Sequence, residues 1–239
     1  AVTAKHPNHV WHVDLTVIPA SSGFWTSWSP FSLPQHWPFC WWVAVVLDHY
    51  SRCVLGVGVF KVCPTSSAVQ SLLDRAIRKS KAKPKHLISG EGKQFWCGSF
   101  KEWCERKRIR PRFGAVGRRG GIAVVERFIG SLESECMDLI LVPFREREFR
   151  RDLAMYGDWY NEHRPHSALG GRTPAEVYGG VTPASQVSRL APRARWPVTA
   201  PCASPPAPVA GEPGAVVRLR VSHHAGRKHL PIVALKRAA

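Results

Sequence analysis

The 239-residue sequence predicts an α/β fold in which helices flank a mixed β-sheet. Three observations predict it. The nearly continuous apolar run at 41–48 is typical of a strand buried on both faces. Three strand-like segments come first, and helical patterns then alternate with short strands. An apolar fraction of 44% is enough to fill the core of such a fold.

The first part of the chain predicts a three-stranded antiparallel meander. Its strands are expected at 9–18, 41–48 and 53–61. The intervening segment 19–40 holds four prolines and three tryptophans. Because proline removes ladder donors and interrupts helices, we expect an aromatic loop or an irregular hairpin there. The Trp-rich stretch 19–42 could stack on unpaired bases. Alternatively, it is an apolar cover over the sheet or a patch that binds a partner protein, and we favour this second interpretation.

Helices and strands alternate after the meander. Thr65 or Ser66 can cap a helix that runs to about residue 79, where apolar residues recur at helical spacing. The remaining expected elements, in order, are a strand at 85–89, a helix ending near Lys107, a strand at 109–113, and helices at about 122–136 and 145–162. Three strands followed by this alternation predict two further strands beside the meander.

Composition divides the chain into three predicted parts. Residues 1–180 form the core, and 181–213 contain eight prolines, as expected of a stiff linker. Residues 214–239 are predicted to form a small C-terminal β arm or module from two β segments. The chain starts at Ala1 without an initiator Met, so we expect a fragment that lacks its N-terminal part.

The balance of charges predicts a polyanionic partner. Lys and Arg number 34 against 17 Asp and Glu, a net charge of +17. Nucleic acid is the commonest partner of so basic a chain. A basic protein without such a partner stays an open alternative. No apolar stretch reaches the roughly 18 residues of a membrane-spanning helix, so a membrane partner is not expected.

The seven cysteines predict free thiols in a reducing cytoplasm, because the count is odd and no Cys-x-x-Cys pair or secretory signal is present. Cys40, Cys53 and Cys136 lie in apolar context and are expected to be small core residues.

Two carboxylates and one glycine form the candidate catalytic pattern. Asp14 lies in an apolar strand and Glu126 near the start of a predicted helix. Phosphodiester cleavage and transfer commonly use two metal ions, and Mg²⁺ prefers carboxylate oxygens. A third carboxylate would complete such a set at the end of the 85–89 strand, where the sequence has Gly90. Asp14 as a buried structural residue and Glu126 as a solvated helix residue remain alternatives.

Five different motifs follow one another along the chain, at 11–16, 47–52, 89–95, 126–135 and 160–174. With these motifs the chain resembles the DDE-type transposase and retroviral-type integrase superfamily, with its ribonuclease-H-like core, over roughly residues 5–180. It looks closest to the bacterial insertion-sequence branch. The family places 35 residues between its second Asp and its Glu, and 35 residues separate Gly90 from Glu126.

The resemblance implies DNA integration, recombination or transposition by metal-dependent strand transfer. Asp14 and Glu126 would be the catalytic residues and the ligands of Mg²⁺ or Mn²⁺. Gly90 stands where the family has its second Asp, which implies a degenerate DDE motif, weak metal binding and impaired activity. Glu91 is a weak substitute, because successive strand residues face opposite ways. The alternative is a catalytically inactive DNA-binding or assembly remnant. The motif at 160–174 argues against an unrelated nuclease.

Phosphate contacts are expected from basic residues around the site, with a merely solvated basic face as the alternative. These residues are Lys93, Lys107, Arg108, Arg110, Arg112, Arg118, Arg119 and Arg127. Asp48 is interpreted as a turn-forming residue outside the catalytic set. The expected partners are DNA and further copies of the chain on DNA, with no small-molecule substrate. The resemblance also implies a bacterial cytoplasmic, nucleoid-associated protein with a DNA-reading domain upstream.

Overall fold

The computed structural model describes residues 3–20, 34–90, 92–114, 122–181 and 217–237. The chain divides into two compact units, residues 1–158 and 159–239. The expected strands and main helices are found within three residues of their predicted ends.

A five-stranded mixed sheet forms the centre of the first unit, in the order β3-β2-β1-β4-β5. The strands are β1 (Val10–Pro19), β2 (Cys40–Asp48), β3 (Val54–Phe60), β4 (His86–Ser89) and β5 (Arg110–Phe113). β1 to β3 pair antiparallel, whereas β4 runs parallel to both β1 and β5. The predicted fold class is therefore confirmed, meander included.

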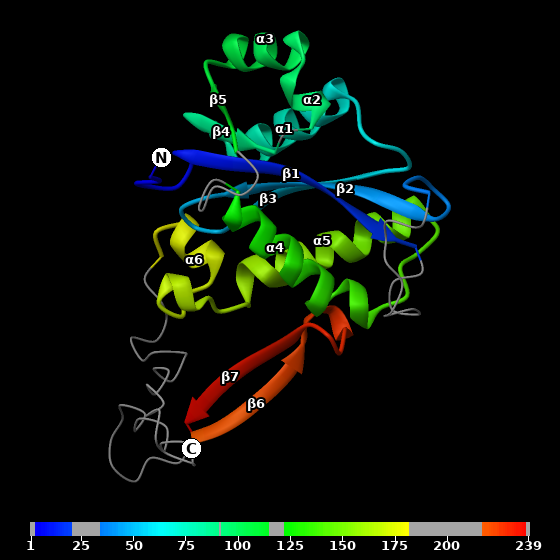
Figure 1. Ribbon diagram of the computed structural model, residues 1–239. Helices are drawn as coiled ribbons and strands as arrows, with labels where there is room; N and C mark the ends of the chain where they lie inside the picture. Colours follow the sequence, from blue (N-terminus) through cyan, green and yellow to red (C-terminus); the bar gives the residue numbers. More distant parts are fainter. Residues whose placement is uncertain (1–2, 21–33, 91, 115–121, 182–216, 238–239) are drawn as a thin grey trace, which may run out of the picture. The chain divides into compact units, whose positions relative to one another are not determined.

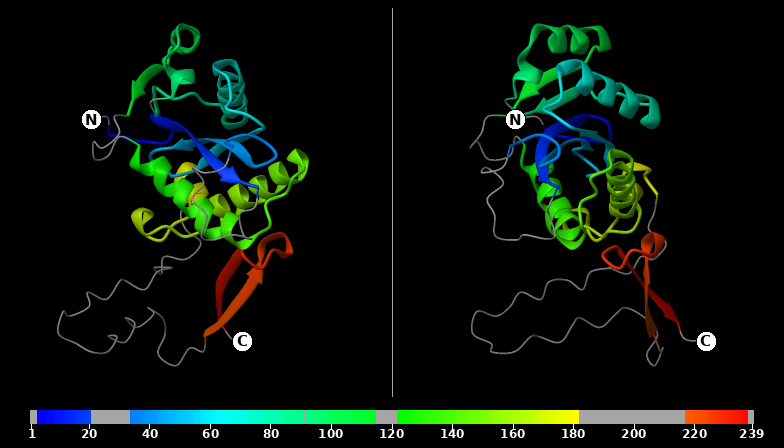
Figure 2. Two further views of the ribbon diagram at one scale, coloured as in Figure 1. Left: turned by 45° about the vertical axis from the view of Figure 1, so that its right-hand side comes forward. Right: turned by 90° about the vertical axis from the view of Figure 1, so that its right-hand side faces the viewer.

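Helices cover both faces of this sheet (Figures 1 and 2). They are α1 (Ser66–Ser80), α2 (Lys93–Trp96), α3 (Gly98–Lys107), α4 (Ala123–Glu135) and α5 (Glu146–Glu162). α1 to α3 lie on one side of the sheet, and α4 and α5 on the other. All positions of β2 except Trp42 are buried, because both layers cover this strand.

Local chemistry explains where α1 begins and how closely it packs. The Thr65 side chain accepts a hydrogen bond from the Ala68 N–H at 3.3 Å, which confirms the predicted cap. In β3, a Cβ built at Gly58 would lie 3.2 Å from a methyl carbon of Leu72 in α1. Glycine at this position therefore permits the close approach of α1 to the sheet.

The single helix expected before Lys107 is two helices. Cys97 is extended between α2 and α3, with φ −68° and ψ 154°. Phe95 and Phe100, buried on either side of this break, are five positions apart, and their rings meet edge to face. Cys40, Cys53 and Cys136 are buried free thiols, as predicted.

Asp48 has the turn-forming role that the sequence indicates. It is fully buried, and its carboxylate accepts three hydrogen bonds. The backbone N–H of Asn8 donates at 2.8 Å, and Ser51 donates from its backbone and its hydroxyl at 2.8 and 2.7 Å. A buried carboxylate with this many donors is satisfied within the fold.

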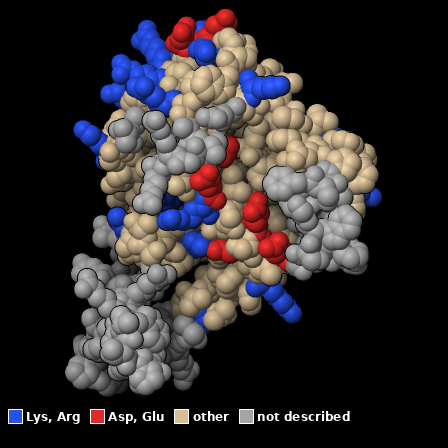
Figure 3. Space-filling model, in the orientation of Figure 1, with Lys and Arg blue, Asp and Glu red and all other residues tan. Residues whose placement is uncertain are grey.

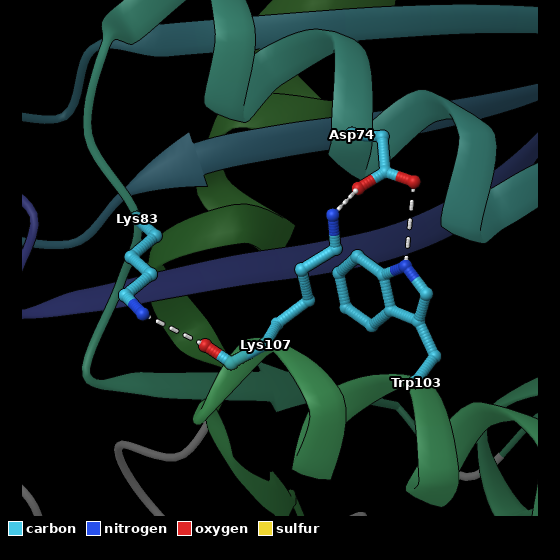
Figure 4. A network of polar contacts seen from close by, with 4 residues as sticks. All are labelled: Asp74, Lys83, Trp103 and Lys107. Carbon is cyan, nitrogen blue, oxygen red and sulfur yellow. Dashed lines mark hydrogen bonds and ion pairs between the residues drawn. The ribbon is translucent and has the colours of Figure 1, made fainter.

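A polar network joins α1 to α3 (Figure 4). Lys107 Nζ lies 2.8 Å from Oδ1 of Asp74, and Oδ2 of the same carboxylate accepts a hydrogen bond from the Trp103 indole at 3.4 Å. Lys83 donates to the backbone carbonyl of Lys107 at 3.0 Å.

The second unit contains the end of α5, a short helix and a β-hairpin. The helix is α6 (Pro174–Tyr178), which the sequence analysis did not predict, although Thr173 and Glu176 form a capping box at its start. The hairpin strands are β6 (Val217–His223) and β7 (Pro231–Arg237). The Trp159 indole donates to the Pro231 carbonyl at 2.9 Å, which ties the hairpin to the end of α5.

Residues 182–213 of the predicted linker lie outside the described residues, and the boundaries at 180 and 213 stay predictions. Among the described helices, none combines the length and hydropathy needed to cross a bilayer.

Candidate active site

Asp14 lies where a neighbouring strand stops. β4 pairs with β1 from Val10 to Val13 and ends at Ser89, opposite Val13. Val10 to Val13 are buried, and Asp14 to Val17 are half-buried. The carboxylate therefore lies at the carboxyl edge of a parallel strand pair, a common place for functional groups in sheets with parallel strands.

Position 90 faces the Asp14 carboxylate. A Cβ built at Gly90 would lie 3.0 Å from Asp14 Oδ1 and 3.9 Å from its Cγ. An aspartate at this position would thus bring a second carboxylate against the first. Glu91, the weak substitute considered from the sequence, lies outside the described residues.

Glu126 comes from the first turn of α4, where a negative charge is favoured by the helix dipole. Val125, Phe128 and Leu132 are the buried residues of this helix, and Glu126 is exposed. Burial raises the pKa of Asp14, the hydrogen bond from the Leu15 N–H at 2.9 Å lowers it, and the charge of Glu126 raises it. The two acids singled out in the sequence therefore interact electrostatically.

Glu133 is a further acidic residue that the sequence analysis did not select. It lies two helical turns after Glu126 and accepts a hydrogen bond from the Thr16 hydroxyl at 3.3 Å. Burial raises its pKa, the Thr16 bond lowers it and the charge of Asp138 raises it. The spacing of seven residues was the available signal, because it places Glu126 and Glu133 on one side of α4. Acidic side chains follow α4 in Figure 3.

His12 is a second residue that the sequence analysis did not select as a site residue. It is fully buried two positions before Asp14, on the same side of β1. Its Nε2 lies 2.7 Å from Nδ1 of His49, which follows β2. Burial, then the nearby His49 and Arg52, lower the pKa of His12 to about 3. A neutral histidine pair therefore supports the strand that carries Asp14.

The predicted DNA-contacting residues occupy several elements. Lys93 begins α2, Arg108 follows α3, and Arg127 lies next to Glu126, all exposed. Arg110 and Arg112 are exposed on β5. The pKa of His86 is lowered chiefly by burial and by the nearby His9, and the charges of the two arginines lower it further. Figure 3 shows Lys and Arg gathered over α3 and β5, with some acidic side chains among them.

Three of the predicted residues differ from this group. Lys107 is half-buried and paired with Asp74. Arg118 and Arg119 lie outside the described residues. Within the described ranges, no three His, Cys, Asp or Glu side chains are grouped so that they could hold a metal ion.

Two family models, both described as "Integrase core domain", match residues 4–119 and 107–174. The chain belongs to the integrase core family of transposases and retroviral integrases. The two matches together include Asp14, Gly90 and Glu126.

Curated relatives of this integrase core are bacterial. A putative transposase for insertion sequence element IS986/IS6110 of Mycobacterium tuberculosis is 26% identical over 181 residues, 72% of this chain and 58% of that protein. Transposase InsF for insertion sequence IS3A of Escherichia coli is 26% identical over 175 residues, 72% of this chain and 54% of that protein. The integrase core thus spans little more than half the length of these relatives.

Solved structures share the fold of the integrase core. The HTLV-2 integrase catalytic core domain in complex with magnesium matches with TM-score 0.51 and 20% identity, over 74% of this chain and 99% of that one. A simian T-cell lymphotropic virus intasome in complex with a PP2A regulatory subunit matches with TM-score 0.54 and 18% identity, over 98% of this chain and 69% of that one.

Asp14→Asn is expected to stabilise the integrase core at neutral pH. Because the pKa of Asp14 is raised in the folded state, ionising this carboxyl lowers the free energy of unfolding. This cost is complete at pH values above the folded pKa and absent at pH values below the unfolded pKa near 3.8. We expect the Tm to rise by roughly 2–4 °C near neutral pH, the shift that about 1 kcal/mol gives at this chain length. Thermal melts across pH test this, with the exposed Asp158→Asn as control. A lower Tm at neutral pH would contradict it.

The His12–His49 pair predicts loss of stability in acid. The pKa of His12 falls from its usual 6.5 to about 3 in the folded state, so the unfolded chain takes up a proton first as pH falls through this window. Each proton that the unfolded state binds and the folded state does not makes the free energy of unfolding fall by up to roughly 1.4 kcal/mol per pH unit as the pH is lowered. Urea unfolding from pH 7 to 5 should show a shallower loss for His12→Asn than for the native chain. Equal slopes would refute the assignment.

Proposed function

We propose that this chain is the strand-transfer core of an insertion-sequence transposase, in which Gly90 impairs the chemistry. The observation that carries the proposal is the direction of position 90 toward the Asp14 carboxylate, with Glu126 in electrostatic reach of Asp14. The family match and the transposase relatives support the reaction class. Because the chain spans only part of those relatives, its activity and its DNA substrate are proposals.

A divalent metal enters the proposal through the carboxylates. When bound, Mg²⁺ or Mn²⁺ would supply activation of the attacking oxygen and stabilisation of the leaving oxygen. Asp14 and Glu126 offer donors, but Gly90 offers none, and the described residues contain no group of three ligands. The residues present therefore do not complete the family's metal site, and weak binding is expected.

The chain's own residues would position DNA. Exposed Arg110 and Arg112 on β5, the strand next to β4, and Lys93 at the start of α2 carry positive charge, and Arg112 is the nearer of the two arginines to the carboxyl ends of the strands. Such residues would hold phosphates without reading sequence. Arg108 and Arg127 would extend these contacts, and Lys107 would do so only by leaving Asp74. Assembly of several copies on DNA belongs to the same proposal, as do a DNA-reading domain upstream and a nucleoid-associated cytoplasmic location.

The second candidate is a catalytically inactive DNA-binding or assembly remnant. The glycine at position 90 favours it, because no other acidic residue in the described part of the chain completes a three-ligand group with Asp14 and Glu126. Loss of one catalytic electrostatic group typically costs on the order of 10²–10³ in rate. The two candidates differ in whether restoring one carboxylate restores the reaction.

Gly90→Asp should create a metal-dependent protein. Without metal, the new carboxylate would repel Asp14, whose Oδ1 would lie about 3 Å from the new Cβ, and the Tm should fall. With Mg²⁺ or Mn²⁺, binding to the folded state should raise the Tm again, and strand transfer or nicking should increase by roughly 10²-fold or more. Thermal melts in chelator and in metal, together with nicking assays on labelled DNA, measure both effects.

Gly90→Asn is the matched control, since it adds the same volume without the charge. It should show neither the metal-dependent Tm nor the gain in activity. If Gly90→Asp binds metal but stays inactive, the remnant is the better description. If it binds no metal, Asp14 and Glu126 are not its ligands.

DNA binding should weaken steeply with salt, because phosphate contacts release counterions. The double variant Arg110→Ala/Arg112→Ala should lower the slope of log affinity against log salt by about two. Fluorescence anisotropy with a duplex at several salt concentrations measures this. Arg78→Ala/Lys79→Ala, which removes two charges at the end of α1, is the control. An unchanged slope in the β5 variant would place the DNA elsewhere.

A further inference from the structure

An exposed aromatic pair lies at the end of α2. Trp96, the last residue of that helix, is 46% exposed to solvent. Its ring stacks on Phe113, with ring centroids 4.0 Å apart and planes at 19°. The Lys101 ammonium lies 5.8 Å from the Trp96 ring centroid. A wide π surface, with the Lys101 ammonium over the Trp96 ring, is thus partly open to solvent.

The stack is anchored at the strand ends that carry the candidate site. Phe113 is paired with Ser89, the residue before Gly90, and the Gly114 N–H donates to the Ser89 carbonyl at 2.9 Å. Side chains alternate between faces along a strand, so Phe113 and Gly90 belong to opposite faces of the same edge. The stack therefore flanks the Asp14–Gly90 edge from the side of α2 and α3.

The charge around the stack favours a polyanion over an apolar protein surface. Between residues 92 and 114 the chain carries Lys93, Lys101, Arg106, Lys107, Arg108, Arg110 and Arg112 against Glu102 and Glu105. An apolar partner would have to desolvate these cations. Single-stranded nucleic acid instead combines phosphates with flat bases, and aromatic side chains beside cations bind it without sequence preference.

Trp37 provides an internal comparison. It is 40% exposed, and the Lys61 ammonium lies 4.9 Å from its ring centroid. Its indole N–H donates to the Phe144 carbonyl at 3.2 Å, so this ring is held by the fold. Trp37 therefore resembles Trp96 in its exposure and in having a nearby cation. It lies before β2 and next to the end of β3, the edge strand opposite β5.

We propose that Trp96 and Phe113 form a stacking platform for an unpaired DNA base next to the Asp14–Gly90 edge. The inference rests on the proposed function in one respect, since it takes DNA as the substrate. It adds that the preferred DNA has a single-stranded nucleotide beside the duplex, such as a short overhang or a base displaced from the helix. The ring of Trp96 holds the base once Lys101, which lies over that ring, moves aside toward the adjoining phosphate.

Equilibrium binding without metal tests the platform separately from catalysis. The probe is a duplex with a short single-stranded overhang that contains one 2-aminopurine, whose fluorescence falls when it stacks on an aromatic ring. The native chain should quench it and should prefer the overhang to a blunt duplex. Trp96→Ala should abolish the quenching and weaken overhang binding by roughly 5- to 100-fold, the range for one stacked base. Trp96→Phe should keep most of both.

Controls and contrary outcomes separate the two proposals. Trp37→Ala should behave like the native chain, and blunt-duplex affinity should be unchanged in Trp96→Ala. If Trp96→Ala retains the quenching and the overhang preference, the platform is wrong and the proposed function stands. If Trp96→Ala instead changes the oligomeric state in sedimentation, the stack is an interface between copies and the inference falls. A native chain that binds no DNA would overturn the proposed function itself.

Discussion

The site depends on the parallel pairing of β4 with β1, and on where that pairing stops. Four residues of β1 are paired with β4, and the pairing ends one position before Asp14. A longer β4 would place a paired strand on both sides of Asp14. Because the strand ends at Ser89, position 90 lies just beyond the paired strand, with its Cβ direction toward Asp14. One short strand thus creates the half-buried edge and places position 90 on it.

Among the described residues, the acidic side chains at this edge are not neutralised by neighbouring cations, which would suit the proposed binding of a cation. Asp14 and Glu133 are both held with raised pKa values, chiefly through burial. Basic side chains lie instead on β5 and around α3, where they raise the local positive potential without neutralising the acids. Acids within and cations around form a pattern suited to phosphates at the rim and a cation between the carboxylates. Gly90 supplies no carboxylate to this group of acids.

Much of the fold was predictable from the sequence, because the patterns that indicate its strands, caps and turns lie within short segments. The buried run of β2, the Thr65 cap and the Asp48 turn each follow from a few neighbouring residues. The break at Cys97 was missed, although the buried residues on either side of it, Phe95 and Phe100, are five positions apart and not three or four. Glu133 and His12 were missed for a different reason. Their roles come from Thr16 and His49, partners that are distant in sequence and meet only in the fold.

The sequence by itself determined the family, the order of the strands and most helices, and the glycine in place of a carboxylate, because motif order and spacing are properties of the chain alone. Only the tertiary structure decided that position 90 faces Asp14, that a histidine pair supports this strand, and that Trp96 stacks on Phe113 beside the edge. Those relations depend on strand register and helix placement, which are set by packing between segments many residues apart.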